Sequence, residues 1–230
     1  MEYGVVICSF NKIAYLRRVV EALCKIEGWK ELILSDDHSD DGTLEWAMGS
    51  KKFTKIVMQP AHQEYCLNTV RNQGVAASRS SHVVILDADC IPQPNYFNGH
   101  NNMFERHGDC LSVGFTDSYN ERGENILSED HRKSYLAGKE SNLMSWNVAY
   151  GGNIAFPVAL WEKVGRFDQG YNGCWGFEDL DFAFRAWKLG FKIVGHRDAL
   201  ARHCLHPIRK DNLPFNRNRS LFEKKNGISL

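Results

Sequence analysis

The sequence predicts an α/β fold with a mostly parallel central sheet. The first half of the chain alternates short apolar runs with segments of helical periodicity. These runs are uninterrupted, which is typical of strands that are buried on both faces of a parallel sheet. Polar turns rich in carboxylates follow two of the runs. In α/β sheets, the crevice at the carboxyl ends of the strands is where ligands bind.

The elements of the first half follow from these patterns in chain order. We expect strands at 5–8, 31–34, 55–58 and 83–86, and helices at 11–26, 43–48 and 67–78. Leu16, Val20 and Leu23 have the spacing of one apolar helix face. Thr43 is the expected N-cap of its helix. Strands and helices that alternate in this way form a parallel sheet with right-handed crossovers.

The second half is less regular. A polar, loop-rich stretch covers 121–138. Beyond it we expect a strand at 151–156, a short helix at 158–164, an amphipathic helix at 178–189 and a strand at 192–195. Because no linker or internal repeat divides the chain, we expect a single domain over 1–230.

Composition argues against several classes of protein. The 230 residues carry a formal net charge of zero, whereas nucleic-acid-binding domains are usually basic. No apolar stretch reaches membrane-spanning length, and no secretory leader is recognisable. The seven cysteines are scattered and form no CxxC pair. This pattern favours free thiols, most of them in the core, and a cytoplasmic location.

Asp87-Ala88-Asp89 is the most informative short motif. It directly follows the apolar run 83–86. Carboxylate oxygens are the ligands that Mg²⁺ or Mn²⁺ prefers, and such ions often bridge a protein and a diphosphate. A plain turn is the alternative, since Asp is common where strands end. Asp36-Asp37 and Ser9-Phe10-Asn11 end two other strands, so these polar segments are expected to converge on one crevice.

Taken in order, these segments resemble the family 2 glycosyltransferases of the GT-A (nucleotide-diphospho-sugar transferase) fold. The resemblance rests on Val5-Val6-Ile7-Cys8-Ser9-Phe10-Asn11, Ser35-Asp36-Asp37-His38-Ser39-Asp40-Asp41-Gly42-Thr43, Arg71-Asn72-Gln73-Gly74 and Asp87-Ala88-Asp89. It implies a nucleotide-sugar-binding half at 1–90, an acceptor and catalytic half at 91–207, and a basic tail at 208–230.

The resemblance also implies a role for each matching residue. Asp37 would accept a hydrogen bond from the nucleotide base, and Arg71 would lie near the nucleotide or its diphosphate. Asp89 would ligate the metal, while Asp87 would contact the ribose or a metal-bound water. The remaining nucleotide-sugar contacts are expected from Ser9, Asn11, Gly152 and Trp175. The plain alternative for Arg71 is a surface helix arginine, and for Gly152 a tight turn.

Trp175-Gly176-Phe177-Glu178-Asp179 precedes and opens the helix predicted at 178–189. It resembles the Trp-Gly-x-Glu-Asp segment of β-galactosyltransferases and chondroitin-type polymerases. That resemblance implies Asp179 as general base and Glu178 as an acceptor-binding residue. Carboxylates at a helix start also complement the helix dipole, which is the plain alternative. Trp175 is a candidate to stack on a sugar, whereas Trp187 is expected in the core.

Two further features concern stereochemistry and the metal. Related retaining transferases that act on polypeptides carry Asn at the position of Asp179; an amide cannot act as a base, so Asp179 favours an inverting displacement. His206, with His203 as the alternative, matches a metal-binding histidine near the end of related catalytic domains. An imidazole beside Asp89 favours Mn²⁺ over Mg²⁺.

The sequence therefore predicts a metal-dependent inverting glycosyltransferase. It would move a sugar from a UDP-sugar, of galactose or N-acetylgalactosamine type, to a hydroxyl of a saccharide or glycolipid in surface polysaccharide synthesis. Two alternatives stay open. A sugar nucleotidyltransferase would normally carry a Gly-rich basic loop, which 8–12 lacks. A silent nucleotide-sugar-binding module would lose the base or the metal carboxylates.

The basic tail has three interpretations. It would close over the diphosphate as a lid, adsorb to anionic lipid at the inner face of the cell membrane, or remain a solvated terminus. The sequence makes no prediction of oligomeric state.

Overall fold

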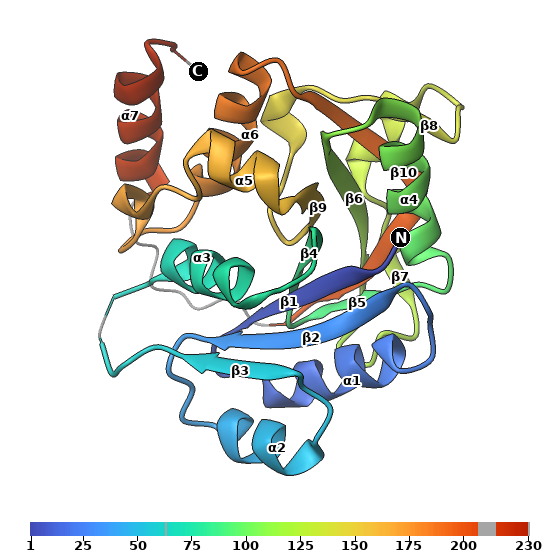
Figure 1. The fold of residues 1–230 in the computed structure, drawn as a ribbon, viewed down its shortest axis with the longest axis vertical. Helices are drawn as coiled ribbons and strands as arrows, with labels where there is room; N and C mark the ends of the chain where they lie inside the picture. The colour runs from blue at the N-terminus through green and yellow to red at the C-terminus, as the bar shows by residue number, and fades with distance from the viewer. Residues whose placement is uncertain (63, 207–214, 230) are drawn as a thin grey trace.

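The computed structural model of the chain describes residues 1–62, 64–206 and 215–229. The described residues form one sheet in the order β3-β2-β1-β4-β9-β6-β10-β5, with β7 beside β6 and β8 beside β10 (Figure 1). The strands are β1 (Tyr3–Ser9), β2 (Trp29–Asp36), β3 (Lys55–Met58), β4 (His82–Asp87), β5 (Cys90–Pro92), β6 (Cys110–Tyr119), β7 (Ile126–Ser128), β8 (Ser141–Leu143), β9 (Asn153–Pro157) and β10 (Lys192–Cys204).

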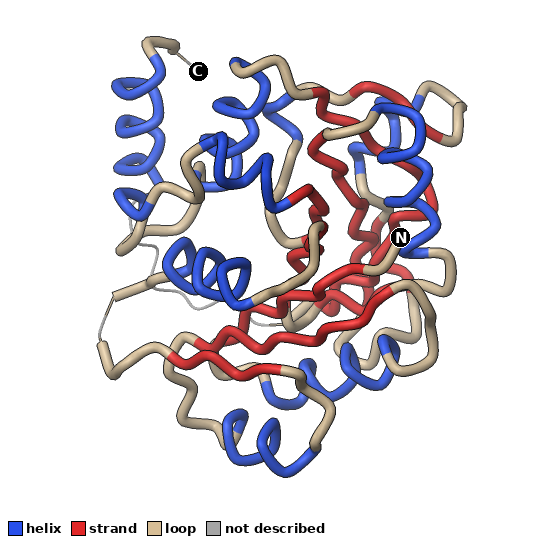
Figure 2. Tube along the Cα trace, viewed as in Figure 1, coloured by secondary structure: helices blue, strands red, loops and turns tan. Residues whose placement is uncertain are grey.

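Helices cover both faces of this sheet. They are α1 (Ile13–Leu23), α2 (Thr43–Ser50), α3 (Leu67–Ala77), α4 (Tyr96–His107), α5 (Val158–Val164), α6 (Glu178–Lys188) and α7 (Phe215–Asn226). Helices α1 and α2 lie on one side of β1–β3, and α3 lies on the other (Figure 1). Figure 2 shows the strands as one continuous twisted layer between these helices.

The first half has the predicted parallel order. β1 pairs in parallel with β2 and β4, and β2 pairs in parallel with β3. Successive side chains of β1 enter opposite faces of the sheet. Val5 belongs to the same buried cluster as Leu16 of α1, and Val6 belongs to another cluster with Val70 of α3. The apolar runs are therefore buried on both faces, which is why they show no alternation of apolar and polar residues.

Antiparallel pairings in the second half bring distant segments to the end of β4. β9 pairs antiparallel with β4, so the turn before β9 meets the residue that ends β4, and the Asp87 N–H donates to the Gly152 carbonyl at 3.0 Å. β10 ends beside β5, where His203 is paired with Cys90. The Cys204 N–H donates to the Asp89 carbonyl at 2.9 Å. The topology thus places the turn before β9 and the end of β10 against Asp87-Ala88-Asp89.

Several element predictions need correction. The strand expected at 192–195 continues to Cys204, because its distal part pairs with β6 and β5. The N-cap of α2 is Gly42, with φ +86°, and not Thr43. The Asp41 carboxylate instead accepts hydrogen bonds from the Thr43 N–H and hydroxyl. Helix α4 and strand β6 had no assigned counterpart in the sequence.

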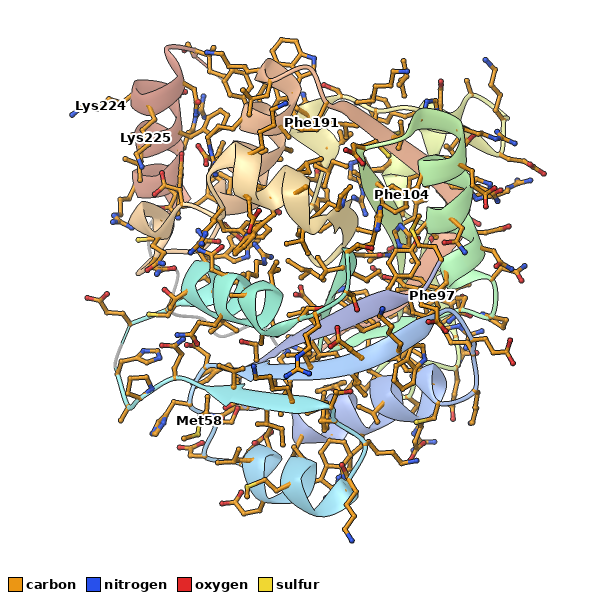
Figure 3. The ribbon with its side chains drawn as sticks, viewed as in Figure 1. Met58, Phe97, Phe104, Phe191, Lys224 and Lys225 are labelled. Carbon is orange, nitrogen blue, oxygen red and sulfur yellow. The ribbon has the colours of Figure 1, made fainter. Side chains whose placement is uncertain are left out.

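The predictions for Trp187, for the cysteines and for the basic tail have different outcomes. Trp187 is 53% exposed, so its core assignment is wrong. All seven cysteines are free thiols, most of them buried, as predicted. Of the basic tail, residues 208–214 and 230 lie outside the described residues. The described part forms α7, which buries Phe222 while Lys224 points away from the body of the molecule (Figure 3).

Within the described residues, no helix has the length and apolar character needed to cross a bilayer.

Candidate active site

A cavity of about 530 Å³ opens beside the end of β4 and the start of α6. Seven of the predicted site residues line it: Arg71, Asp87, Gly152, Trp175, Glu178, Asp179 and His203. They come from both halves of the chain. The cavity therefore brings together the Asp87 motif and the Trp175–Asp179 segment, which the sequence analysis could connect only through the family resemblance.

Asp89 and two histidines form a group with the chemistry of a metal site. His206 Nε2 lies 2.9 Å from Asp89 Oδ2, and His203 Nε2 lies 3.7 Å from Asp89 Oδ1. The ligand atoms all lie within 4.8 Å of one another. Burial disfavours the Asp89 carboxylate, but the His206 hydrogen bond and the Lys12 charge outweigh it and hold the pKa of Asp89 below its usual range. One carboxylate with two imidazoles fits a transition metal such as Mn²⁺.

Asp87 lies under the glycine turn before β9. A Cβ on Gly152 would stand only 2.5 Å from Asp87 Oδ2, so this position has no room for a side chain. Burial raises the pKa of Asp87, and nearby Asp89 raises it further, while Arg71 opposes the shift. The pKa of Asp87 is therefore shifted upward and the pKa of Asp89 downward, and it is Asp89 that lies beside the ring nitrogens of His203 and His206.

Arg71 is buried, with 2% of its surface exposed, so it is no surface helix arginine. Its Nη1 lies 3.5 Å from Glu178 Oε1, and its guanidinium lies over the ring of Phe167. Arg71 Nε and Glu178 Oε2 have no hydrogen-bond partner among the described residues. Burial and then the neighbouring Asp179 raise the pKa of Glu178 to about 7, against the opposing charge of Arg71.

Backbone amides hold Asp179 at the cavity. Its Oδ2 accepts the Gly151 N–H at 2.9 Å, and its Oδ1 accepts the Leu180 N–H at 2.8 Å. The preceding residues turn sharply, since both Gly176 and Phe177 have positive φ. This turn leaves Trp175 63% exposed at the cavity, where it lies 5.6 Å from the ring of Phe215 on α7.

Asp37 lies in the loop after β2. Its N–H donates to the Ser9 carbonyl at 2.8 Å, and His62 Nε2 lies 2.9 Å from its carboxylate. The Cys66 N–H donates to the same carboxylate at 3.3 Å. Asp37, His62 and Cys66 also place their ligand atoms within 4.8 Å of one another.

Ser9 and Asn11, near Asp37, differ in the hydrogen bonds of their side chains. Ser9 Oγ is buried without a hydrogen-bond partner among the described residues. Asn11 has φ +52° and uses its side-chain oxygen to accept the Asp40 N–H at 2.9 Å. The side chain of Asn11 therefore helps to fix the loop that carries Asp37.

Two cationic residues near the predicted site, Lys12 and Arg132, were not predicted from the sequence. Lys12 Nζ lies 3.1 Å from Asp89 Oδ2. Its only signal in the sequence was its place directly after Asn11. Arg132 lines the cavity, lies over the ring of Tyr150 and pairs with Asp130. No sequence signal distinguished it, because 121–138 reads as a polar loop.

Comparison with known proteins identifies the family. A model described as "Glycosyltransferase like family 2" matches residues 2–221. Chondroitin synthase of Escherichia coli is 24% identical, over 91% of this chain and 35% of its own length. Chondroitin synthase of Pasteurella multocida (strain Pm70) is 24% identical, over 83% of this chain and 24% of its own. The chain thus spans about a quarter to a third of these relatives.

Solved structures show the same fold. S. aureus TarS 1-349, in complex with UDP-GlcNAc, has a TM-score of 0.74 at 13% identity, over 98% of this chain and 66% of that one. GalNAc-T7 with UDP, GalNAc and Mn2+ has a TM-score of 0.76 at 16% identity, over 97% of this chain and 48% of that one. With its sheet order, its cavity at the end of β4 and the family match over residues 2–221, the chain belongs to glycosyltransferase family 2 and is an enzyme of the GT-A fold.

Proposed function

We propose that this enzyme is a metal-dependent, inverting transferase that uses a UDP-sugar and glycosylates a hydroxyl of a saccharide or glycolipid. The observation that carries the proposal is the position of Asp179, which lines one cavity with Asp87 and His203. A carboxylate held by two backbone amides keeps its orientation and has lone pairs left to take a proton.

In this proposal Asp179 removes the proton from the acceptor hydroxyl while that oxygen attacks the anomeric carbon. The bond from the anomeric carbon to the β-phosphate oxygen breaks, and its electron pair leaves with UDP. A single in-line displacement inverts the anomeric configuration. Glu178, turned toward Arg71, orients the acceptor rather than taking the proton.

The donor end of the proposal uses Asp37 for the base, with Ser9, Asn11, Arg71 and Asp87 around the nucleotide. Asp89, His206 and His203 would hold the metal. When bound, a divalent ion supplies positive charge that stabilises the leaving diphosphate. Support comes from the ligand chemistry of the Asp89 group and from a structural neighbour solved with UDP, GalNAc and Mn2+.

Donor and acceptor class are also proposals. The Trp175–Asp179 segment favours galactose or N-acetylgalactosamine as the donor sugar. Two of the relatives are chondroitin synthases and a third is a hyaluronan synthase, which supports a role in polysaccharide synthesis. We place the enzyme in the cytoplasm, working at the inner membrane face on a membrane-associated acceptor.

The central test is the Asp179→Asn variant. We expect sugar transfer to fall by about a thousandfold, because the amide cannot take the proton, while UDP binding changes less than about twofold. Transfer is measured as UDP release with Mn²⁺ over a panel of UDP-sugars and acceptors, and NMR of the product reports the anomeric configuration. The exposed Asp109→Asn variant is the control. A fully active Asp179→Asn enzyme, or a retained configuration, overturns the proposal.

A further inference from the structure

Lys12 places a positive charge inside the group of predicted metal ligands. Its Nζ lies 3.1 Å from Asp89 Oδ2 and also contacts His206 Nε2. The same Asp89 oxygen lies 2.9 Å from that ring nitrogen. An ammonium therefore shares the Asp89 oxygen and the imidazole nitrogen that a metal ion would use.

The backbone of Lys12 is fixed while its side chain is long. Its carbonyl accepts the N–H groups of Tyr15 and Leu16 at the start of α1. Its Nζ lies 5.3 Å from the centre of the Tyr15 ring, which in turn lies 5.5 Å from the His206 ring. The ammonium can thus leave Asp89 by rotation of a flexible stem, without movement of the helix.

An ammonium and a divalent cation cannot share this position. Both need the same carboxylate oxygen, and at a few ångströms their charges repel strongly in a half-buried site. We propose that Lys12 is an exchangeable counter-cation of the metal site, an inference that rests on the proposed metal-dependent function. It neutralises Asp89 in the metal-free enzyme, and it is displaced when the metal binds.

The displaced ammonium stays tethered next to the metal. A metal bound alone therefore meets a repelling charge, whereas a metal that carries the diphosphate of the donor brings an anion for Lys12 to pair with. Lys12 consequently opposes binding of the bare ion and favours binding of the ion with nucleotide. Metal and UDP are coupled through one side chain, and this coupling is reciprocal.

The test compares Lys12→Met with Lys133→Met. Lys133 is a matched control, because it pairs with Asp117 at 2.6 Å with 27% of its side chain exposed, against 23% for Lys12, and Asp117 is not one of the predicted metal ligands. Mn²⁺ binding is measured by calorimetry and by loss of the free-ion EPR signal. Without nucleotide, Lys12→Met is expected to bind Mn²⁺ at least about tenfold more tightly, and the control unchanged.

The second arm measures UDP binding at saturating Mn²⁺. There Lys12→Met is expected to bind UDP about tenfold more weakly, because the diphosphate has lost a cation. A Lys12 that served only as a structural ion pair would not produce changes of opposite sign. Unchanged or weaker Mn²⁺ binding by Lys12→Met overturns the inference, as does unchanged UDP binding.

Two controls distinguish a failure of this inference from misfolding of a variant and from a failure of the proposed metal dependence. Thermal unfolding checks each variant, and Lys12→Gln, which keeps the stem and a polar head, replaces Lys12→Met if the latter does not fold. Wild-type transfer that continues in EDTA, with no Mn²⁺ binding, refutes the metal dependence itself. Transfer that requires Mn²⁺ in the wild type, together with unchanged Mn²⁺ affinity in Lys12→Met, refutes only the role of Lys12.

Discussion

Glu178 and Asp179 are adjacent carboxylates with different surroundings. Glu178 is buried against Arg71, whereas Asp179 is held at the cavity by two backbone N–H groups. The pKa of Glu178 rises to about 7, chiefly through burial. A shared helix start therefore produces one buried carboxyl with a raised pKa and one carboxylate that two backbone N–H groups hold at the cavity.

This difference predicts a pH-dependent stability. Because the native state holds the Glu178 proton more tightly than the unfolded state, unfolding free energy from this group falls as pH rises from 4.5 to about 7. The effect is on the order of 1–3 kcal/mol. We expect the Tm of the wild type to fall more steeply over that window than the Tm of Glu178→Gln.

Scanning calorimetry at several pH values measures the two slopes. The exposed Glu162→Gln variant is the control and should follow the wild type. Parallel curves for wild type and Glu178→Gln would show that the proton on Glu178 is not bound more tightly in the folded enzyme.

The sequence indicated seven residues that line the cavity, but not the contacts that they make. Asp89 and His206 are 117 positions apart, and Arg71 and Glu178 are 107 apart. Local motifs carry no information about such distances. Lys12 shows the consequence: nothing near it in the sequence indicates that its ammonium meets a histidine from the far end of the chain.

At the scale of elements, α7 packs against the loop that carries Trp175 at the cavity. The side-chain amide nitrogen of Asn218 lies 2.9–3.1 Å from the carbonyl oxygens of Tyr171, Cys174 and Gly176, which share its two N–H donors. Asn218 is fully buried. Because these carbonyls belong to the loop that carries Trp175, α7 fixes the conformation of that loop.

Removing this amide should separate acceptor binding from donor binding. Asn218→Ala leaves three buried carbonyls without their donor, at a cost of about 1–3 kcal/mol of unfolding free energy. We expect the KM for acceptor to rise several-fold, because the loop loosens, while the Kd for UDP is unchanged.

Steady-state kinetics and calorimetry distinguish these quantities. Asn216→Ala, on the exposed side of the same helix, should behave as wild type in both. If Asn218→Ala weakens UDP and acceptor binding equally, α7 supports the whole site rather than one side of it.

The elements that the sequence predicts well are those with one dominant cause. Strand 83–86 is a buried apolar segment between turns, strand 55–58 is a short apolar segment at the sheet edge, and helix 158–164 buries one apolar face; the structure has elements at these places. Trp187 fails because it lies in the last turn of α6, which extends past the core: residues 187–190 are all exposed. The distal part of β10 fails because its pairing with β6 and β5, not its own pattern, makes it a strand.

At the scale of the whole molecule, the site is assembled from both halves of one sheet. β4 supplies Asp87, and β9 and β10 bring the glycine turn and His203 to it. A ligand that contacts both halves should therefore stabilise them together. This expectation also tests whether 1–230 is a single domain.

The UDP–Mn²⁺ complex, taken as one ligand at about 100 times its Kd, should add about 2.7 kcal/mol to the free energy of unfolding. For a chain of this size, that corresponds to a rise in Tm of about 5–10 °C in one cooperative transition. Differential scanning fluorimetry and calorimetry measure it. Asp89→Asn should lose the Mn²⁺-dependent part. Two transitions, of which only one shifts, would contradict a single domain.

The turn before β9 has a consequence for the reaction geometry. The Gly151 N–H holds the proposed base Asp179, and the carbonyl of the next residue, Gly152, holds the backbone of Asp87. Two consecutive glycines, whose Cα atoms are about 3.8 Å apart, therefore contact the proposed base on one side and Asp87 on the other. The spacing of these two contacts depends on the φ and ψ angles of the glycines, and Arg71 and Asp87 occupy the space where their side chains would lie. A larger residue at either position would therefore displace a charged side chain of the cavity and shift both contacts at once.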